Sequence, residues 1–239
     1  MADQAIGRLD SSAEMIPNPD LFVGMYVRKE AVLSSQIEGV TQASLSEVLG
    51  HEVRHRRHSV PPDIVEVLNY ADAMNHALDR VKTLPLSNRL LREVHQHLVK
   101  GVRGSEITPG DFRTTQNWIG PPGCDLNGAV FVPPPPNVMM DPLGDLERYI
   151  HEHPLTPTLV QAGLIHYQFE TIHPFLDGNG RMGRLLVVFF LCQKMVLKRP
   201  LLYISEFFKA YKDEYYERLQ AVRDAGNIED WLKFFLRVA

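Results

Sequence analysis

A glycine-rich segment between two helical patterns, residues 173–184, constrains the fold of this chain more than any other feature. Upstream, over 159–172, apolar side chains recur at helical spacing. The pair His173-Pro174 ends that pattern, because a residue before proline avoids the α region. A continuous apolar run, 185–192, follows the segment directly. The segment therefore joins one helix to another, and its surroundings are predicted to be helical.

The same twelve residues, HPFLDGNGRMGR, combine groups that suit phosphate chemistry. Glycine N–H groups at a helix N-terminus can surround a phosphate, and arginines can neutralise it. A carboxylate can hold Mg²⁺, and a histidine can take a proton near neutral pH. Part of the run also matches GxGxxG, but a dinucleotide-binding fold needs a buried strand before that motif. The helical pattern upstream argues against such a fold.

The run resembles the signature of the Fic/DOC family, H-x-F-x-[DE]-G-N-G-R-x-x-R. Every fixed position of the signature is present: His173, Phe175, Asp177, Gly178, Asn179, Gly180, Arg181 and Arg184. The resemblance extends to 34–39, SSQIEG, which is similar to the family's inhibitory motif, and to 110–120 and 131–136, which are similar to segments around its flap. The intact G-N-G-R core resembles the AMP-transferring branch rather than the kinase-like branch.

The resemblance implies an all-α fold, a Fic-type helical domain with a small β-hairpin flap over the active site. Helical patterns are predicted over 20–37, 44–56, 63–82, 87–100, 141–152, 157–172, 181–196, 207–225 and 228–238. We expect an N-terminal helical region over 1–60, which carries the inhibitory motif, and a catalytic core over 61–239.

The flap is expected in the Gly- and Pro-rich region 104–140. Residues 129–132 favour a short strand, and the Asn-Gly pair before them is a favoured hairpin turn. The flap residues of this prediction are Gly128, Ala129, Val130 and Phe131. A strand edge beside an active site could hold a target protein as an extended segment by backbone pairing.

The implied activity is transfer of AMP from ATP to a Ser, Thr or Tyr hydroxyl of a target protein. His173 would be the catalytic base, and Asp177 would hold Mg²⁺ at the phosphates. Phe175 would anchor the loop in the core. The nucleotide would lie on the motif and on two tyrosines of a later helix: Asp177, Gly178, Asn179, Gly180, Arg181, Met182, Gly183, Arg184, Tyr215 and Tyr216.

The inhibitory motif has Ser34, Glu38 and Gly39 at its fixed places. Within the family pattern, Glu38 would pair with Arg184 and occupy the place of the γ-phosphate, so that ATP binds with its phosphates misplaced. The chain would then be an autoinhibited protein adenylyltransferase. Two alternatives stay open: an enzyme that removes AMP or transfers another phosphate-containing group, and a non-catalytic module that senses ATP.

Composition bears on partners and location. A net charge of −4 and an isoelectric point near 6.2 give no basis for a nucleic-acid surface. The N-terminus lacks a secretory pattern, and no apolar run is long enough to span a membrane. Two cysteines, Cys124 and Cys192, suit a reducing compartment, so we expect a cytoplasmic protein. Self-modification and a homo-oligomer are both compatible with the sequence.

Overall fold

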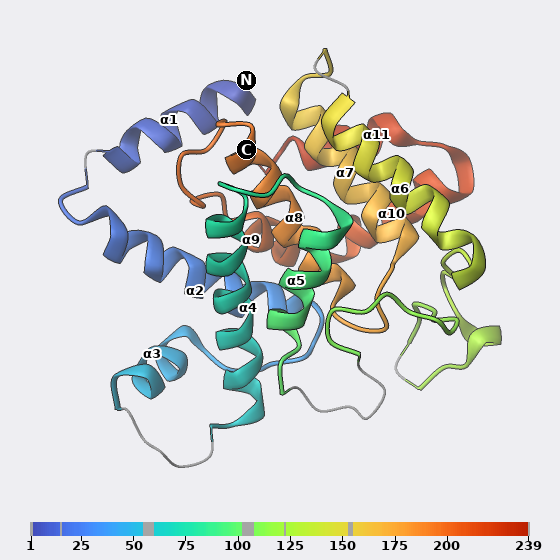
Figure 1. Cartoon of the computed structure of the whole chain (residues 1–239), viewed down its shortest axis with the longest axis horizontal. Coiled ribbons are helices and arrows are strands. Elements are labelled where there is room, and N and C mark those ends of the chain that lie inside the picture. The colour runs from blue at the N-terminus through green and yellow to red at the C-terminus, as the bar shows by residue number, and fades with distance from the viewer. Residues whose placement is uncertain are drawn as a thin grey trace.

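The computed structural model describes residues 2–14, 16–54, 60–101, 108–121, 123–152 and 155–238. Over these residues the fold is helical, as the sequence predicts (Figure 1). The helices are α1 (Ala2–Glu14), α2 (Pro19–Ile37), α3 (Leu45–Arg54), α4 (Pro62–Arg80), α5 (Asn88–Leu98), the 3₁₀ turn η1 (Leu126–Gly128), α6 (Pro136–Glu152), α7 (Thr158–Ile172), α8 (Asn179–Gln193), α9 (Ile204–Ala210), α10 (Lys212–Ala225) and α11 (Ile228–Phe235).

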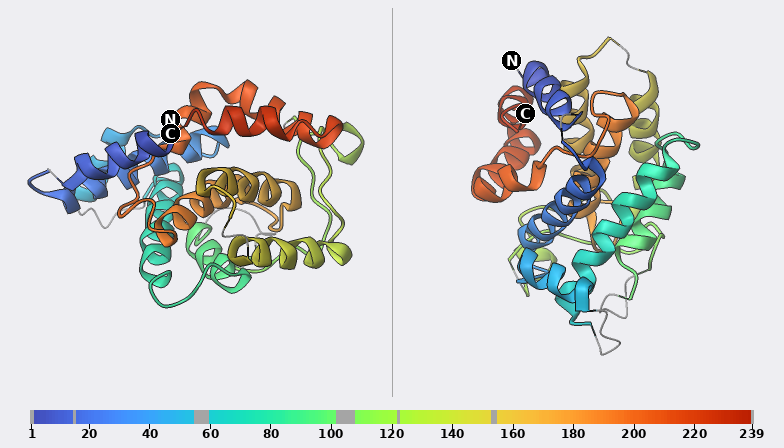
Figure 2. Two further views of the ribbon diagram at one scale, coloured as in Figure 1. Left: turned by 90° about the horizontal axis from the view of Figure 1, so that it is seen from above. Right: turned by 90° about the vertical axis from the view of Figure 1, so that its left-hand side faces the viewer.

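Helix α8 lies at the centre of the molecule (Figure 1, Figure 2). All of its residues from Asn179 to Leu191 are buried. It packs against α7 along one side and also contacts α2, α4 and α5. A helix that is apolar all round must be covered on every side, which explains why the run 185–192 forms the middle of the core.

Helix α2 places the inhibitory motif next to α8. It begins where Asn18 accepts a hydrogen bond from the backbone N–H of Leu21 and Pro19 occupies the first turn. It packs against α9 and α4 and also contacts α8. The helix ends at Ile37, Glu38 follows as its C-cap, and Gly39 has a φ of +73°. Glycine adopts this left-handed conformation without strain, so the chain turns away directly after Glu38.

Several element boundaries differ from the sequence-based prediction. Helix α1 was not predicted. Helix α6 begins at Pro136 rather than at 141, because a proline fits the first turn of a helix without losing a hydrogen bond. A second proline, Pro142, lies inside this helix. The predicted helix 207–225 is divided into α9 and α10, since Tyr211 leaves the helical region with φ −118° and ψ 40°.

The β-hairpin predicted around Asn127-Gly128 is not formed among the described residues. The Asp125 side chain accepts hydrogen bonds from the N–H groups of Asn127 and Gly128, which closes the 3₁₀ turn η1 instead. Neither turn residue has the positive φ that a type I′ hairpin requires. In the described part of this region, Ile119 and Phe131 instead form an isolated antiparallel bridge.

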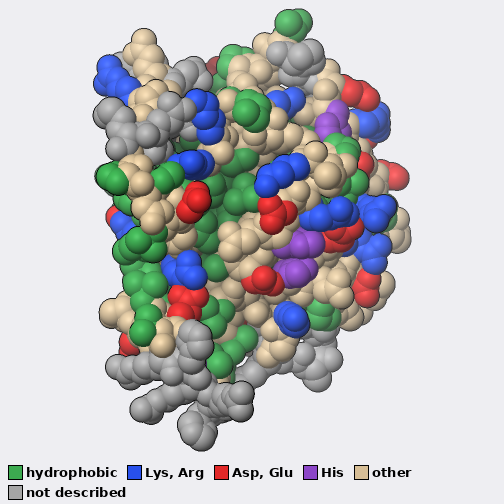
Figure 3. All heavy atoms as spheres, turned by 60° about the vertical axis from the view of Figure 1, so that its left-hand side comes forward, with side chains coloured by type: hydrophobic (Ala, Val, Ile, Leu, Met, Phe, Trp, Pro, Cys, Tyr) green, Lys and Arg blue, Asp and Glu red, His purple; other side chains and the backbone are tan. Residues whose placement is uncertain are grey.

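The two ends of the chain lie on the same side of the molecule in each view (Figure 1, Figure 2). On the face drawn in Figure 3, basic and acidic side chains are interspersed rather than gathered into a patch of one sign. Within the described part of the chain, no helix combines the length and the apolar character needed to cross a membrane.

Candidate active site

The loop between α7 and α8 is built on two left-handed residues. His173, the C-cap of α7, has φ 51° and ψ 60°, and its N–H donates to the carbonyl oxygen of Phe169 at 2.9 Å. Gly178, the N-cap of α8, has a φ of +76°. A non-glycine residue in this region is strained, and such strain collects at functional sites. The loop therefore holds His173 in a fixed, unusual conformation at the N-terminus of α8.

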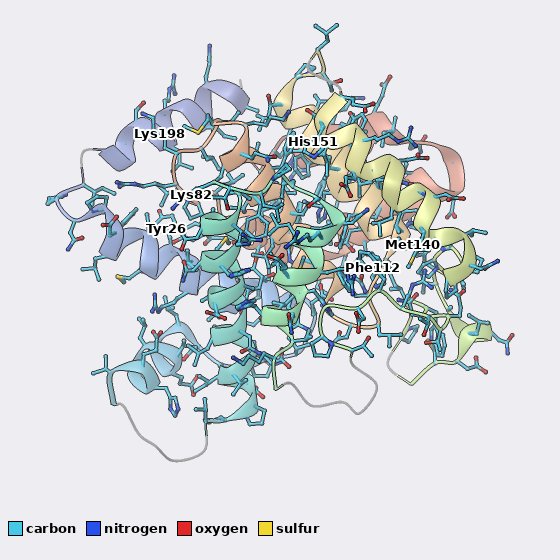
Figure 4. All side chains as sticks on the ribbon, in the orientation of Figure 1. Tyr26, Lys82, Phe112, Met140, His151 and Lys198 are labelled. Atoms are coloured by element: carbon cyan, nitrogen blue, oxygen red, sulfur yellow. The ribbon has the colours of Figure 1, made fainter. Side chains whose placement is uncertain are left out.

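The loop is anchored by Phe175, which is fully buried as predicted. Its ring stacks on His95 of α5 with the centroids 3.8 Å apart and is tilted against Phe112, which lies next to α5 in Figure 4. Asn179 closes the loop from inside: its Oδ1 accepts from the N–H of Phe175 at 2.8 Å, and its Nδ2 donates to the Phe175 carbonyl at 2.7 Å. The Asn179 side chain thus shapes the loop.

Arg113 connects the loop to the flap region. Its Nε donates to the His173 carbonyl at 2.9 Å, and its Nη2 donates to the Pro134 carbonyl at 2.5 Å. Asn117 adds a bond from Nδ2 to the Phe175 carbonyl at 2.9 Å. Residues 113–117 and 133–134 are therefore fixed against the backbone of the motif.

The flap region is also held from its other side. The guanidinium of Arg223 in α10 lies over the Phe131 ring, 3.6 Å from its centroid. Its Nη2 donates to the backbone carbonyl of Glu170 in α7 at 3.3 Å. Phe131, the last of the four predicted flap residues, is therefore attached to α10. The other three, Gly128, Ala129 and Val130, directly precede it in the sequence.

His173 is largely enclosed, with 16% of its side chain exposed. Burial lowers its pKa to about 4, so the ring is neutral at physiological pH. The carboxylate of Glu170 lies one helical turn before it, with Oε2 3.9 Å from Nδ1. A neutral imidazole beside a carboxylate is the form that can accept a proton.

Arg184 is fully buried and binds the inhibitory motif. Its Nε donates to the Ser34 hydroxyl at 2.8 Å, and its Nη2 donates to the Ser34 carbonyl at 3.0 Å and to Glu38 Oε1 at 2.9 Å. Burial alone would raise the pKa of Glu38, but Arg184, together with Arg181 and His173, outweighs burial and the pKa is lowered. The predicted Glu38–Arg184 ion pair is therefore present, with Glu38 ionised.

Glu38 lies directly over one glycine of the motif, Gly180. A Cβ atom added to Gly180 would overlap the Glu38 carboxylate. This carboxylate thus occupies the position above the N-terminus of α8, where the free N–H groups favour an anion. Nη1 of Arg184 and Nε of Arg181 are buried and have no hydrogen-bond partner among the described residues. An anion that carries more oxygens than one carboxylate would suit this environment.

Arg181 and Asp177 are positioned differently from each other. Arg181 is fully buried, and its Nη1 lies 2.5 Å from Oε2 of Glu66 in α4. Asp177 is 44% exposed and approaches Arg181 only at 3.4 Å. Asp177 is therefore free to turn toward a ligand, while Arg181 is held in place.

The residues present suit Mg²⁺ only together with a phosphate-bearing ligand. Within the described ranges no cluster of three His, Cys, Asp or Glu side chains could hold a metal alone. Mg²⁺ often binds through one carboxylate and substrate phosphates, and the Asp177 carboxylate next to the α8 N-terminus fits that mode.

The structure separates the two tyrosines predicted at the nucleotide. Tyr215 is buried, and its hydroxyl lies 2.9 Å from Nε2 of His166. Tyr216 is 40% exposed, and the charge of Glu38 acts on it. Met182 and Gly183 face inward from α8, since both are buried. The nucleotide-binding roles of these residues stay predictions.

Sequence reasoning missed four residues that build the site: Glu66, His95, Arg113 and Glu170. All four lie outside the motif: Glu66, His95 and Arg113 reach it through tertiary packing, and Glu170 reaches it along its own helix, α7. Nothing in the sequence spacing of Glu66, His95 and Arg113 marks them as site residues. One signal was available: Glu170 lies three residues before His173, which places both side chains on the same helix face.

Comparisons with known proteins agree with the motif. Residues 1–79 match the sequence model of the Fic/DOC family N-terminal region, and residues 85–191 match that of the Fic/DOC family. A probable protein adenylyltransferase of Aquifex aeolicus is 26% identical over 172 residues, which cover 70% of this chain and 48% of that protein. A protein adenylyltransferase Fic of Drosophila yakuba is 30% identical over 156 residues, covering 64% of this chain and 28% of that protein.

Solved structures show the same fold. A Fic family protein from Desulfovibrio desulfuricans has a TM-score of 0.77 at 23% identity, covering 99% of this chain and 71% of that chain. Fic-1 from C. elegans (residues 134–508) has a TM-score of 0.67 at 20% identity, covering 99% and 68%. The chain spans less than half the length of the two curated relatives. With both family regions matched and every fixed position of the signature present, the chain belongs to the Fic/DOC family.

Proposed function

We propose that the chain is a protein adenylyltransferase that transfers AMP from ATP to a hydroxyl group of a protein and that Glu38 restrains it. The observation that carries the proposal is the position of the Glu38 carboxylate, over Gly180 and against the buried Arg184. An acidic group there marks a site built for an anion. The names of the relatives support ATP as the nucleotide.

In this proposal His173 is the base. Its ring is neutral because burial lowers its pKa to about 4. It accepts the proton of the attacking hydroxyl, the oxygen bonds to the α-phosphorus, and the bond from that phosphorus to the bridging oxygen of pyrophosphate breaks. The N–H groups at the start of α8, with Arg181 and Arg184, bind the phosphates. Mg²⁺ held by Asp177 would supply charge neutralisation of the leaving group.

Restraint follows from competition for one arginine. Among the described residues, Nε of Arg184 bonds Ser34, and Nη2 bonds Ser34 and Glu38. A γ-phosphate that needs the Nη2 bound by Glu38 must displace that carboxylate or bind elsewhere, and a displacement of about 1 Å at the reacting atoms can lower the rate on the order of 100-fold.

The target is proposed to bind along the segment attached at Phe131, as an extended chain. Val130 is 61% exposed and Val132 is 45% exposed on either side of the bridged residue. Exposed side chains at alternate positions of an extended segment suit pairing with another chain. The flap would then act through this single bridged segment, without the hairpin expected from the sequence.

The test uses ATP labelled on the α- or the γ-phosphate, the Glu38→Gly protein, and Glu38→Gly/His173→Ala as its control. AMP transfer predicts α-label on protein with Glu38→Gly, no γ-label, and loss of the signal in the double variant. Protein labelled from the γ-phosphate would contradict AMP transfer and indicate a kinase-like reaction. Bound ATP with no transfer of either label would indicate a nucleotide-sensing module.

A further inference from the structure

Glu170 is a buried carboxylate that the proposed reaction does not use. Its side chain is 7% exposed and lies in the last turn of α7. Oε1 has no hydrogen-bond partner among the described residues, and Nδ1 of His173 has none either. Oε2 of Glu170 lies 3.9 Å from that Nδ1. The Glu170 carboxyl group and the His173 ring therefore face each other, through Oε2 and Nδ1, without a hydrogen bond between them, and a small side-chain rotation would form one.

The neighbouring helix leaves room for this carboxylate. A Cβ atom added to Gly183 of α8 would overlap Oε1 of Glu170 and would come within 3.2 Å of the His166 ring. Gly183 is not left-handed, so no turn explains the glycine there. The close approach of Glu170 does explain it. The contact links α7, which carries His173, to α8, which carries the phosphate-binding residues.

We propose that Glu170 is a positioning residue for His173, whose carboxyl group determines which imidazole nitrogen carries the proton. The proposal rests on the proposed role of His173 as the base. An ionised carboxylate can only accept a hydrogen bond, so it holds the ring proton on Nδ1 and leaves Nε2 free to accept. A protonated carboxyl group donates to Nδ1 instead, which puts the ring proton on Nε2 and blocks that nitrogen.

The burial of Glu170 makes this a pH-dependent choice. Burial raises the pKa of Glu170 to about 7, whereas that of His173 is about 4, so the ring stays neutral while the carboxyl group titrates. Activity should therefore rise with pH near neutrality. The groups that face Glu170 from the packed elements are Glu38 of α2, His166 of α7, Arg184 of α8, and Tyr215, Tyr216 and Arg223 of α10.

The test is the tautomer of His173 in the nucleotide-free protein, read from ¹⁵N shifts and assigned by loss of the signal in His173→Gln. The intact protein should show Nε2–H at about pH 5.5 and Nδ1–H at about pH 8.5. Glu170→Gln should show one tautomer at both values. Glu30→Gln is the matched control, because Glu30 is also buried with a pKa near 7 but bonds Ser205, and it should keep the change.

The backbone carbonyl of Glu170 also acts on the ring and can only accept. The proposal would be overturned if His173 carried its proton on Nδ1 at both pH values, in the intact protein and in Glu170→Gln alike. That result would mean that the backbone carbonyl alone determines the tautomer. If Glu170→Gln does not fold, Glu170→Asp replaces it, with a weakened pH change expected. Loss of AMP transfer in every protein would contradict the proposed function and leave this measurement intact.

Kinetics add a second readout in the Glu38→Gly background. Glu170→Gln should lower kcat on the order of 100-fold, leave KM for ATP unchanged, and remove the rise of activity near neutral pH. A merely structural role would lower both kcat and thermal stability without changing the pH profile. An unchanged kcat with the pH profile retained would overturn the proposal.

Discussion

Arg181 and Glu66 form an ion pair in the protein interior, with Nη1 2.5 Å from Oε2, although 115 positions separate them in the sequence. Arg181 is fully buried, and the Glu66 side chain is 11% exposed. A buried guanidinium without a partner is costly, so this contact makes it feasible for the motif arginine to lie inside the core. The pair also fixes α4 against α8.

Replacing Glu66 should therefore destabilise the fold. Glu66→Gln removes the charge that compensates Arg181 and is expected to lower the free energy of unfolding by about 3 kcal/mol, measured by urea denaturation. Glu93→Gln is the control, since Glu93 bonds Arg80 at 2.9 Å in a partly exposed pair, and should cost less than about 1 kcal/mol. Equal losses in the two variants would mean that burial of the Arg181 charge is unimportant.

The buried Glu30 should make stability depend on pH. It accepts hydrogen bonds from the N–H and hydroxyl groups of Ser205, and burial raises its pKa to about 7. An acid whose pKa is higher in the folded state favours folding below its unfolded value near 4.5 and loses that contribution as pH rises through 7. Glu30→Gln, which cannot ionise, should gain on the order of 1–3 kcal/mol relative to the intact protein between pH 5 and pH 8. Parallel stability curves would show that Glu30 does not titrate in this range.

Tyr215 and Tyr216 should respond to mutation in opposite ways. Tyr215→Phe removes the partner of the buried His166 and should cost about 1–3 kcal/mol of stability with little change in ATP affinity. Tyr216→Ala should leave stability almost unchanged and weaken ATP binding about 10-fold, if its half-exposed ring stacks on the base. Calorimetric titration with thermal melts distinguishes the two; a larger loss of affinity in Tyr215→Phe would refute this division.

Arg223 should keep the flap region ordered. Arg223→Met removes the contact over Phe131, so hydrogen exchange should become faster at the amides of Val130 and Phe131, which both donate to the Ile119 carbonyl. Arg237→Met is the control, because the Arg237 guanidinium lies 4.8 Å from the Tyr211 ring centroid, outside the flap region. Exchange at Val130 and Phe131 that is as slow in Arg223→Met as in the control would show that Arg223 does not hold the flap.

The motif loop was predictable because its determinants are local. The proline after His173, the left-handed Gly178 and the apolar residues that follow fix a helix–loop–helix over adjacent positions. The ion pair between Glu38 and Arg184 was expected only from the resemblance to a family pattern. Composition or periodicity alone would have assigned Glu38 to a solvated helix end.

Other parts of the site depend on distant contacts that no local pattern contains. Glu66 and Arg113 reach the motif from elements far along the chain. The hairpin prediction failed for a local reason. The Asn-Gly pair favours a hairpin turn, but the Asp125 carboxylate accepts hydrogen bonds from the N–H groups of both residues, and this closes a 3₁₀ turn instead.

The most direct test of the proposed function is the initial rate of α-label incorporation into protein for the intact chain, Glu38→Gly and Glu38→Gly/His173→Ala, at equal concentration and with ATP binding checked for each. Loss of the carboxylate over Gly180 frees Arg184 for the phosphates, so Glu38→Gly should be faster on the order of 100-fold and the double variant should be inactive. A Glu38→Gly rate equal to that of the intact chain, with both proteins binding ATP, would contradict restraint by Glu38; transfer that persists without His173 would contradict its role as the base.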